Sequence, residues 1–228
     1  MIAGFEPALR GMRNPMNSWD KSDSKHVWPA DIDGKDDIRG CHLLIGDNDM
    51  QLAQRLISGG SEHRKFIRQI QVWVDITAPQ YWWSEFDTYK VGTVANSTSK
   101  MHKLVSTPIT KDCFEMDHYS NLPIDTYYVD PNATVDDIWN VVVEYAEKLR
   151  IRYLETKDKM YWKELIRLLP ESWLQTRTVS MNYENIRNIV HQRKNHKLTE
   201  WSDSFIQWAR TLPYSNELIF YDGSEDGE

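Results

Sequence analysis

Gln69-Ile-Gln-Val-Trp-Val-Asp-Ile76 carries the clearest strand pattern in the chain. Its aliphatic residues alternate with polar or aromatic ones, which is the period of a half-buried β-strand. Pro79 follows shortly after, and because proline suits the first turn of a helix, residues 80–88 are predicted to form a short aromatic helix. The chain is therefore expected to combine a sheet with helices.

Several further helices are predicted on either side of this strand. Thr134 with Asp137 forms a capping-box-like start, and an apolar stripe over residues 138–149 extends it into a long helix. Residues 173–181 are rich in Thr and Val and fit a connector or a strand. Apolar residues at helical spacing predict other helices at residues 48–58, 159–169, 182–193 and 199–212.

Three segments are predicted to lack long regular structure. Residues 1–40 are interpreted as an irregular N-terminal lead-in, because Gly, Pro, Asn and charged residues mix there without a period. Prolines interrupt residues 106–132, and the acidic residues 222–228 are expected to be a disordered tail. Residues 1–228 are expected to form a single domain, since chains of this length commonly stay undivided.

Charge and composition argue against several classes of protein. The 27 Lys and Arg residues against 34 Asp and Glu leave a formal charge of −7, which argues against binding to a long nucleic acid. A local cluster would still suffice for a small anion. Two distant cysteines and no signal-like apolar N-terminus predict a reduced compartment, and a cytoplasmic location is expected. The histidines show no ligand spacing, so no metal is expected, and no apolar run is long enough to cross a membrane.

A first motif lies at Glu85-Phe-Asp-Thr-Tyr-Lys-Val-Gly-Thr-Val-Ala-Asn-Ser-Thr-Ser-Lys-Met-His102. With one inserted residue, it resembles the first signature of the flavin-dependent thymidylate synthases, QxxRHRxxSxNExSxRY. Thr88-Tyr-Lys90 stands where that signature has RHR, and Asn96 and Ser99 are identical to it. Glu85 replaces its Gln and adds a negative charge. Lys90 keeps one positive charge but lacks the planar fork with which arginine binds phosphate.

A second motif, Met181-Asn-Tyr-Glu-Asn-Ile-Arg-Asn-Ile-Val-His-Gln-Arg193, resembles the second signature of the same family, NxRxLxxFLxLR, without a gap. Asn182 and Arg193 are retained, and Glu184 reverses the charge of an arginine. Asn188 falls where some members carry a flavin-contacting Asn or His. Upstream, Arg167-Leu-Leu-Pro170 is similar to the ARxxLP stretch of the family, one residue out of register.

The resemblance implies a fold, a reaction and a set of site residues. The family fold is α/β (α+β), thymidylate synthase-complementing-protein-like, with helices packed on a curved, largely antiparallel sheet and assembly as a homotetramer. The family reaction is the reductive methylation of dUMP by methylenetetrahydrofolate and reduced FAD; here the substrate is expected to be dUMP or a related pyrimidine nucleotide. Arg193 takes the catalytic position. The implied substrate-binding residues are Glu85, Ser97, Thr98, Ser99, Lys100, Arg167 and Arg193. The implied cofactor-binding residues are Thr88, Tyr89, Lys90, Asn96, Asn182, Glu184 and Asn188.

Other interpretations stay open at this point. The chain fits a nucleotide-binding or regulatory protein that keeps the family fold but has lost the flavin, because Glu85 and Glu184 place negative charge at ligand positions. It also fits a structural or assembly protein that uses its aromatic surface. Each candidate residue has an ordinary structural role as well: Asn182 suits a helix N-cap, and Arg193 suits the C-terminus of a helix, where a cation interacts favourably with the dipole.

Overall fold

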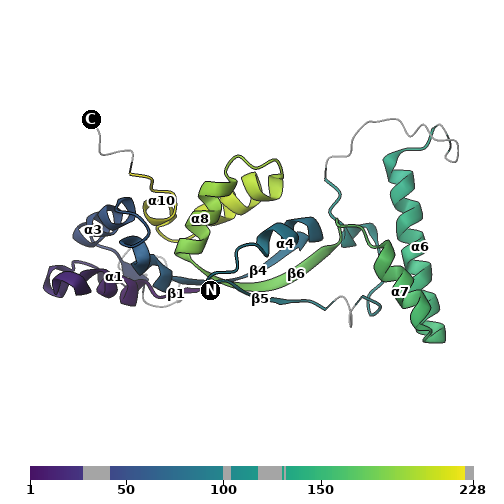
Figure 1. The fold of residues 1–228 in the computed structure, drawn as a ribbon, viewed down its shortest axis with the longest axis horizontal. Helices are drawn as coiled ribbons and strands as arrows, with labels where there is room; N and C mark the ends of the chain where they lie inside the picture. The colour runs from purple at the N-terminus through teal and green to yellow at the C-terminus, as the bar shows by residue number, and fades with distance from the viewer. Residues whose placement is uncertain (28–41, 100–103, 118–129, 131, 224–228) are drawn as a thin grey trace. The chain divides into compact units, whose positions relative to one another are not determined.

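The structure is a computed structural model that describes residues 1–27, 42–99, 104–117, 130 and 132–223. Helices and an antiparallel sheet combine in it, as Figure 1 shows, which confirms the predicted α/β class. Lys100 and residues 224–228, for which predictions were made, lie outside the described residues.

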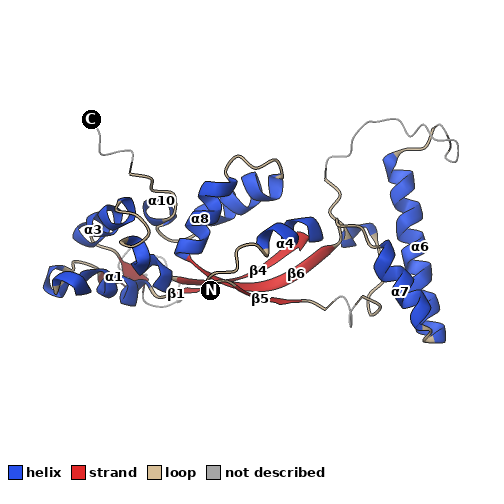
Figure 2. Cartoon of the chain, viewed as in Figure 1, coloured by secondary structure: helices blue, strands red, loops and turns tan. Residues whose placement is uncertain are grey.

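The main sheet has four strands in the order β1-β4-β6-β5 (Figure 2). The predicted strand is confirmed as β4, and the segment that fitted a connector or a strand is β6. Asp75 accepts a hydrogen bond from Thr178, and Thr77 faces Thr176 with 2.7 Å between their hydroxyl oxygens, so β4 and β6 run in opposite directions. The strands are β1 (Ile2–Ala3), β4 (Gln71–Pro79), β5 (Val94–Ser97) and β6 (Leu174–Asn182), with β2 (Lys25–Val27) and β3 (His42–Leu44) in a second, two-stranded sheet.

The chain forms two compact units. Unit 1 consists of Met1–Val74, Tyr89–Val94 and Val179–Glu228, and unit 2 consists of Asp75–Thr88 and Ala95–Thr178. Whether the two units behave as the single domain that we expected stays a prediction.

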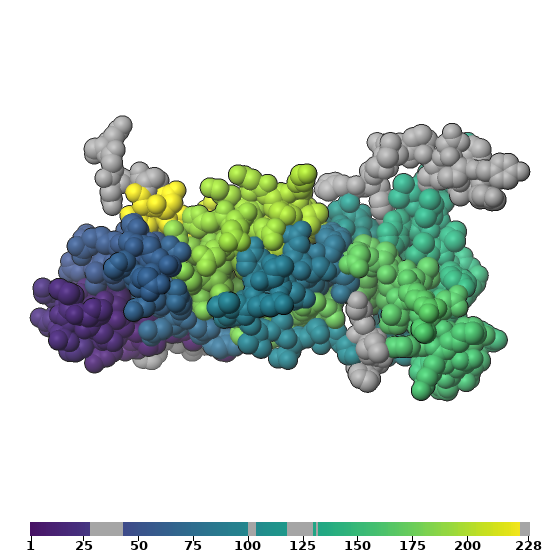
Figure 3. All heavy atoms as spheres, viewed as in Figure 1, coloured from purple at the N-terminus to yellow at the C-terminus, as the bar shows by residue number. Residues whose placement is uncertain are grey.

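Unit 1 is built around a short 3₁₀ helix, η3 (Arg64–Gln69), which contacts three α-helices. Phe66 and Ile67 of η3 are buried, so this turn forms the centre of an apolar core. Figure 3 shows the N-terminal residues and those of residues 42–70 as neighbouring masses of atoms. The helices of unit 1 are α1 (Phe5–Arg13), α3 (Asp47–Ser58), α8 (Tyr183–Arg193), α9 (Ile206–Arg210) and α10 (Ser215–Leu218), with a π-helical turn η5 (Glu200–Phe205) before α9.

Helix α1 corrects the prediction for the N-terminal segment. Residues 1–40 were expected to be irregular, yet β1, α1 and β2 all lie within the first 27 residues. Ala8, Leu9 and Met12 share one face of α1 and are buried. Burial of this face favours the helix, although Pro7 and Gly11 weaken the local helical signal. The remaining residues of the predicted lead-in, 28–40, lie outside the described residues.

A buried ion pair ties α1 to α3. Asp49 is fully buried, and its Oδ1 accepts a hydrogen bond from Nε of Arg13 at 2.6 Å. The hydroxyls of Ser22 and Ser24 donate to Oδ2 at 2.6 and 2.5 Å. Burial by itself would raise the pKa of Asp49, but these hydrogen bonds together lower it below the ordinary value. The carboxylate is therefore charged, and it holds residues 13–24 against α3.

Replacement of this carboxylate tests its role in stability. Asp49→Asn leaves the Arg13 guanidinium buried without its partner and is expected to lower the free energy of unfolding by about 3–5 kcal/mol in urea denaturation at neutral pH. The matched control is Asp47→Asn, an exposed change in the same first turn, expected to cost less than about 1 kcal/mol.

The difference in unfolding free energy between wild type and Asp49→Asn should also depend on pH. Because the pKa of Asp49 is lowered from 3.8 by folding, its contribution is complete above that value and is lost as pH falls through the lower folded pKa. The difference between wild type and Asp49→Asn should shrink only in that acidic range. If Asp49→Asn and Asp47→Asn lost equal free energy of unfolding at neutral pH, this account would be contradicted.

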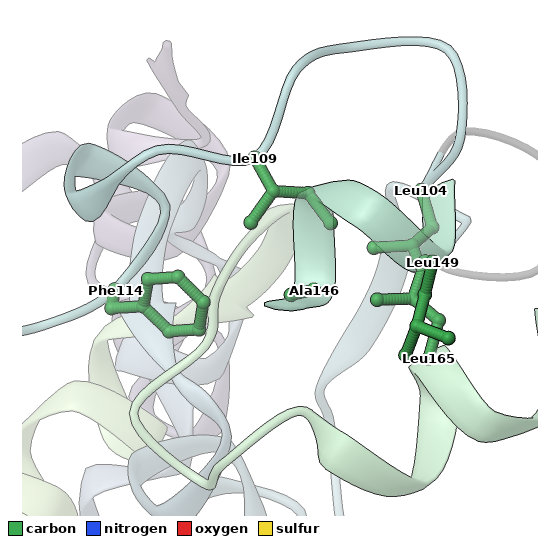
Figure 4. Packing of buried hydrophobic residues seen from close by; sticks show 6 residues of the cluster. All are labelled: Leu104, Ile109, Phe114, Ala146, Leu149 and Leu165. Atoms are coloured by element: carbon green, nitrogen blue, oxygen red, sulfur yellow. The ribbon is translucent and has the colours of Figure 1, made fainter. Parts of the chain in front are cut away.

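Unit 2 contains the long predicted helix. Thr134 accepts from the backbone N–H of Asp137, and Asp137 accepts from the N–H of Thr134, so the capping box is confirmed. Six buried residues pack between this helix, its neighbour and the preceding loop, as Figure 4 shows: Leu104, Ile109, Phe114, Ala146, Leu149 and Leu165. The helices of unit 2 are α4 (Gln80–Phe86), α6 (Val135–Thr156) and α7 (Lys159–Leu168), with a 3₁₀ turn η4 (Lys111–Cys113). None of the helices in the described part of the chain combines the length and apolar character that a bilayer crossing requires.

Candidate functional site

The two motif segments meet in unit 1, where residues 89–94 lie against the start of α8. Asn182 is the N-cap of α8, as predicted, and its Oδ1 accepts from the N–H of Asn185 at 2.9 Å. The Oδ1 of Asn185 accepts from the N–H of Asn182 at 3.1 Å. The amide nitrogen of Asn185 donates to the carbonyl of Val91 at 2.7 Å. The side chain of Asn185 thus takes part in the helix cap and also joins the first motif to the second.

At Gly92 the backbone of the first motif lies close to the side chains of the α8 cap. Its φ is +79°, a left-handed conformation that residues with a Cβ rarely adopt. A Cβ at this position would lie 3.0–3.2 Å from side-chain atoms of Asn182 and Asn185. The glycine therefore allows the backbone of the first motif to approach the capped helix end.

Arg193, at the other end of α8, lies beside aromatic rings. Its Nε donates to the hydroxyl of Tyr89 at 2.8 Å, and that hydroxyl donates to Oε1 of Gln192 at 3.1 Å. The guanidinium carbon lies 5.6 Å from the centroid of the Tyr89 ring and 5.0 Å from that of Trp201, which is fully buried. Both distances suit cation–π attraction. We call Tyr89, Gln192, Arg193 and Trp201 the arginine cradle.

The charge reversal at Glu184 is compensated within the protein. Glu184 is buried, and both of its carboxylate oxygens lie 3.1 Å from Nε of Arg64 in η3. The negative charge is therefore paired with a cation that the two motifs do not contain. Whether Glu184 also contacts a cofactor stays a prediction.

Two further residues of α8 have no counterpart in the motif comparison. Arg187 is buried and donates to the carbonyls of Ile219, at 2.8 Å, and Tyr221. Burial first and then the charge of Arg64 lower the pKa of Arg187. Burial and the charge of Arg187 lower the pKa of His191, whose Nε2 is buried without a hydrogen-bond partner among the described residues. Their spacing on α8 gives only an amphipathic pattern, so no sequence signal could have set them apart from core positions.

Two predicted cofactor residues of unit 1 have donor groups available. Lys90 is exposed, and its ammonium forms no hydrogen bond or ion pair with a described residue. Asn188 is half-buried on α8, and its amide likewise has no side-chain partner in the described ranges. An ammonium and an amide fit a cofactor that carries phosphate groups and a ring with hydrogen-bonding edges.

The other predicted residues belong to unit 2. Asn96 and Ser97 are exposed on β5, Arg167 is exposed on α7, and Ser99 and Glu85 are half-buried. The backbone of Thr98 is bonded on both sides, to the carbonyl of Thr176 at 2.9 Å and to the Gln175 amide at 2.8 Å. The hydroxyl of Thr88 donates to the carbonyl of Glu85 at 2.7 Å, which closes the end of α4. These placements leave the substrate and cofactor roles of the residues as predictions.

The described residues contain no group of three or more His, Cys, Asp or Glu side chains placed to hold a metal ion. The site offers oriented cations, amides and hydroxyls. Such groups bind anionic and ring-shaped molecules.

Comparison with known proteins gives a clear result for the fold. No protein-family model matches this sequence, and a search of curated proteins gave no match. Two crystal structures of the flavin-dependent thymidylate synthase ThyX from Helicobacter pylori are similar to the chain, each with a TM-score of 0.63. Their identities are 18% and 17%, over 97% of this chain and 96% and 95% of theirs. Both contain FAD and dUMP. The chain therefore has a ThyX-like fold.

The contact at Gly92 can be tested with a second glycine as its control. Gly92→Ala and Gly60→Ala both place a Cβ at positive φ, which costs about 1–3 kcal/mol each. Only Gly92 has neighbours, because nothing lies within 4 Å of a Cβ at Gly60. Gly92→Ala is expected to lower the free energy of unfolding by more than Gly60→Ala in urea denaturation. Equal losses would show that residues 89–94 do not pack on the cap of α8.

Proposed function

We propose that the chain is a divergent flavin-dependent thymidylate synthase-like protein. Its reaction is the reductive methylation of dUMP or a related pyrimidine nucleotide, with methylenetetrahydrofolate as one-carbon donor and reduced FAD as cofactor. The observation that carries the proposal is the arginine cradle, in which Tyr89 of the first motif binds Arg193 of the second at 2.8 Å. The ThyX-like fold, seen in two structures with FAD and dUMP, supports it.

Arg193 is the residue to which we assign the chemical role. Two rings and the Tyr89 hydroxyl restrict its guanidinium, so the charge is oriented before a ligand binds. A preorganised cation stabilises negative charge that develops on a pyrimidine ring better than a mobile one does. The bound flavin supplies the hydride, so no protein nucleophile is required.

The remaining roles follow the motif positions. The motif comparison assigns flavin binding to Lys90 and Asn188, whose polar groups have no partners among the described residues, and likewise to Thr88, Tyr89, Asn96, Asn182 and Glu184. Hydroxyls at residues 97–99 bind the nucleotide phosphate, and Glu85 and Arg167 contact the substrate.

A second candidate function is nucleotide binding without flavin. The Glu184–Arg64 ion pair favours it, because a buried carboxylate occupies a position where the family signature has an arginine, and its partner cation is already bound. On this interpretation the chain is a binding or regulatory protein that keeps the ThyX-like fold. The arginine cradle and the nucleotide are common to both candidates, and only the flavin separates them.

The homotetramer of the family is part of the proposal. Ile138, Val141 and Tyr145 lie on one side of α6 and are 41%, 67% and 46% exposed. An apolar stripe of this kind is suited to burial against another copy of the chain. The molar mass of the purified protein in solution tests this part of the proposal.

The function is tested by colour and by nucleotide titration of the same preparation. The protein, alone or after reconstitution with FAD, is expected to be yellow and to bind dUMP more tightly than uridine. Arg193→Gln removes a charge-assisted contact worth about 1.5–3 kcal/mol, so dUMP should bind about 10- to 100-fold more weakly. Lys194→Gln, the neighbouring exposed cation, is the matched control and should leave binding unchanged.

The outcomes separate the candidates. A colourless protein that cannot take up FAD but prefers dUMP through Arg193 supports the second candidate. A protein that does not distinguish dUMP from uridine overturns both.

A further inference from the structure

A cavity of about 200 Å³ lies in unit 1, away from every residue of the two motifs. Helix α1 contributes one wall, the turn η2 (Trp19–Lys21) and the residues after it another, and β2 and β3 the rest. None of the residues of the arginine cradle lines it. Its lining consists of Glu6, Leu9, Arg10, Arg13, Trp19, Ser22, Ser24, His26 and Leu43.

The floor of the cavity is rigid and carries unused donors. Arg13 is 5% exposed and is held by Asp49 through Nε and by the carbonyl of Ser18 through Nη1 at 3.3 Å. Its Nη2 makes no hydrogen bond within the described part of the chain. Asp49 itself is fully covered, so the floor presents the donor side of the ion pair. An acceptor on a ligand would give this guanidinium a further charge-assisted hydrogen bond.

The wall of the cavity combines a cation with a flat ring. The guanidinium carbon of Arg10 lies 5.2 Å from the centroid of the Trp19 ring, and Nε1 of Trp19 donates to Asn14 at 2.8 Å, which fixes the ring. Arg10 and Arg13 are three residues apart on α1 and therefore share one face of the helix. Arg10 has no carboxylate partner among the described residues. The only acidic residue in the lining, Glu6, is 71% exposed and faces His26 at 3.4 Å.

We propose that this cavity is a binding site for a small planar aromatic carboxylate. The carboxylate meets Arg10 and the free donors of Arg13, because guanidinium groups bind a planar carboxylate through paired hydrogen bonds. The ring stacks on Trp19 and contacts the apolar side chains of Leu9 and Leu43. The cavity volume of about 200 Å³ suits a single ring with one substituent, since an engineered protein cavity of roughly 150 Å³ binds benzene.

This site is independent of the proposed nucleotide chemistry. Its residues come from the N-terminal segment, from β2 and from β3, and its ligand carries a carboxylate instead of a phosphate. It can therefore fail while the proposed function holds, and the reverse is also true.

The test uses benzoate as the probe in isothermal titration calorimetry of the full chain. Benzoate is expected to bind saturably with one site per chain, and benzamide, its neutral isostere, to bind at least about tenfold more weakly. Cyclohexanecarboxylate, which keeps the charge but not the flat ring, should also bind more weakly. Arg10 is exposed, so Arg10→Gln should fold normally, as thermal unfolding will confirm, and should weaken benzoate binding about tenfold.

Two matched controls locate the binding. Arg55→Gln makes the same change on the exposed face of α3, outside the lining, and should bind benzoate as wild type does. Arg193→Gln should also leave benzoate binding unchanged, because the arginine cradle is not part of the cavity. The proposal is overturned if benzoate does not bind saturably, if benzamide or cyclohexanecarboxylate binds equally well, or if Arg10→Gln leaves benzoate binding unchanged.

Discussion

The double hydrogen bond between Asn182 and Asn185 is the interaction on which the candidate site depends. A helix begins with backbone N–H groups that have no partner in the helix, and a capping box satisfies two donors with two side chains. Here the side chain of Asn185 also donates to the carbonyl of Val91, so the residue that completes the capping box holds the other motif segment. Gly92 makes the approach possible, and Tyr89, two residues before Val91, contacts Arg193 at the C-terminal end of α8. The cap and the arginine cradle thus join the two motifs at opposite ends of α8.

Charge is balanced differently here from what the family signatures would suggest. Glu184 stands where those signatures have an arginine, but Arg64 neutralises it at 3.1 Å, so the negative charge does not face a ligand alone. Both the motif comparison and the geometry single out Arg193. The rings of Tyr89 and Trp201 hold its guanidinium, and the other arginines of the family signatures are absent. A fold at 18% identity leaves the chemistry to be established from such local features, because one fold supports many functions.

Local patterns predicted the elements that depend on neighbouring residues. The strand β4, the capping box of α6 and the N-cap at Asn182 all follow from side chains within a few positions of each other. Helix α1 could not be predicted in this way, because Pro7 and Gly11 weaken its local signal. Burial against other elements favours the helix. The motif comparison named Tyr89 and Arg193, but their contact spans more than a hundred residues of sequence. Arg64 and Asp49 lie in neither motif. Their ion pairs, with Glu184 and Arg13, are formed only in the folded chain.

A double-mutant cycle between Tyr89 and Arg193 tests the central claim most directly. The free energies of unfolding of wild type, Tyr89→Phe, Arg193→Gln and the double variant give the coupling between the two motif segments. Because phenylalanine keeps the ring, the cycle isolates the hydrogen bond of 2.8 Å, which predicts a coupling of at least about 0.5 kcal/mol. If the losses of unfolding free energy were additive, with a coupling near zero, the account would be contradicted. The Tyr89 hydroxyl and the Arg193 guanidinium would then not interact in the folded protein.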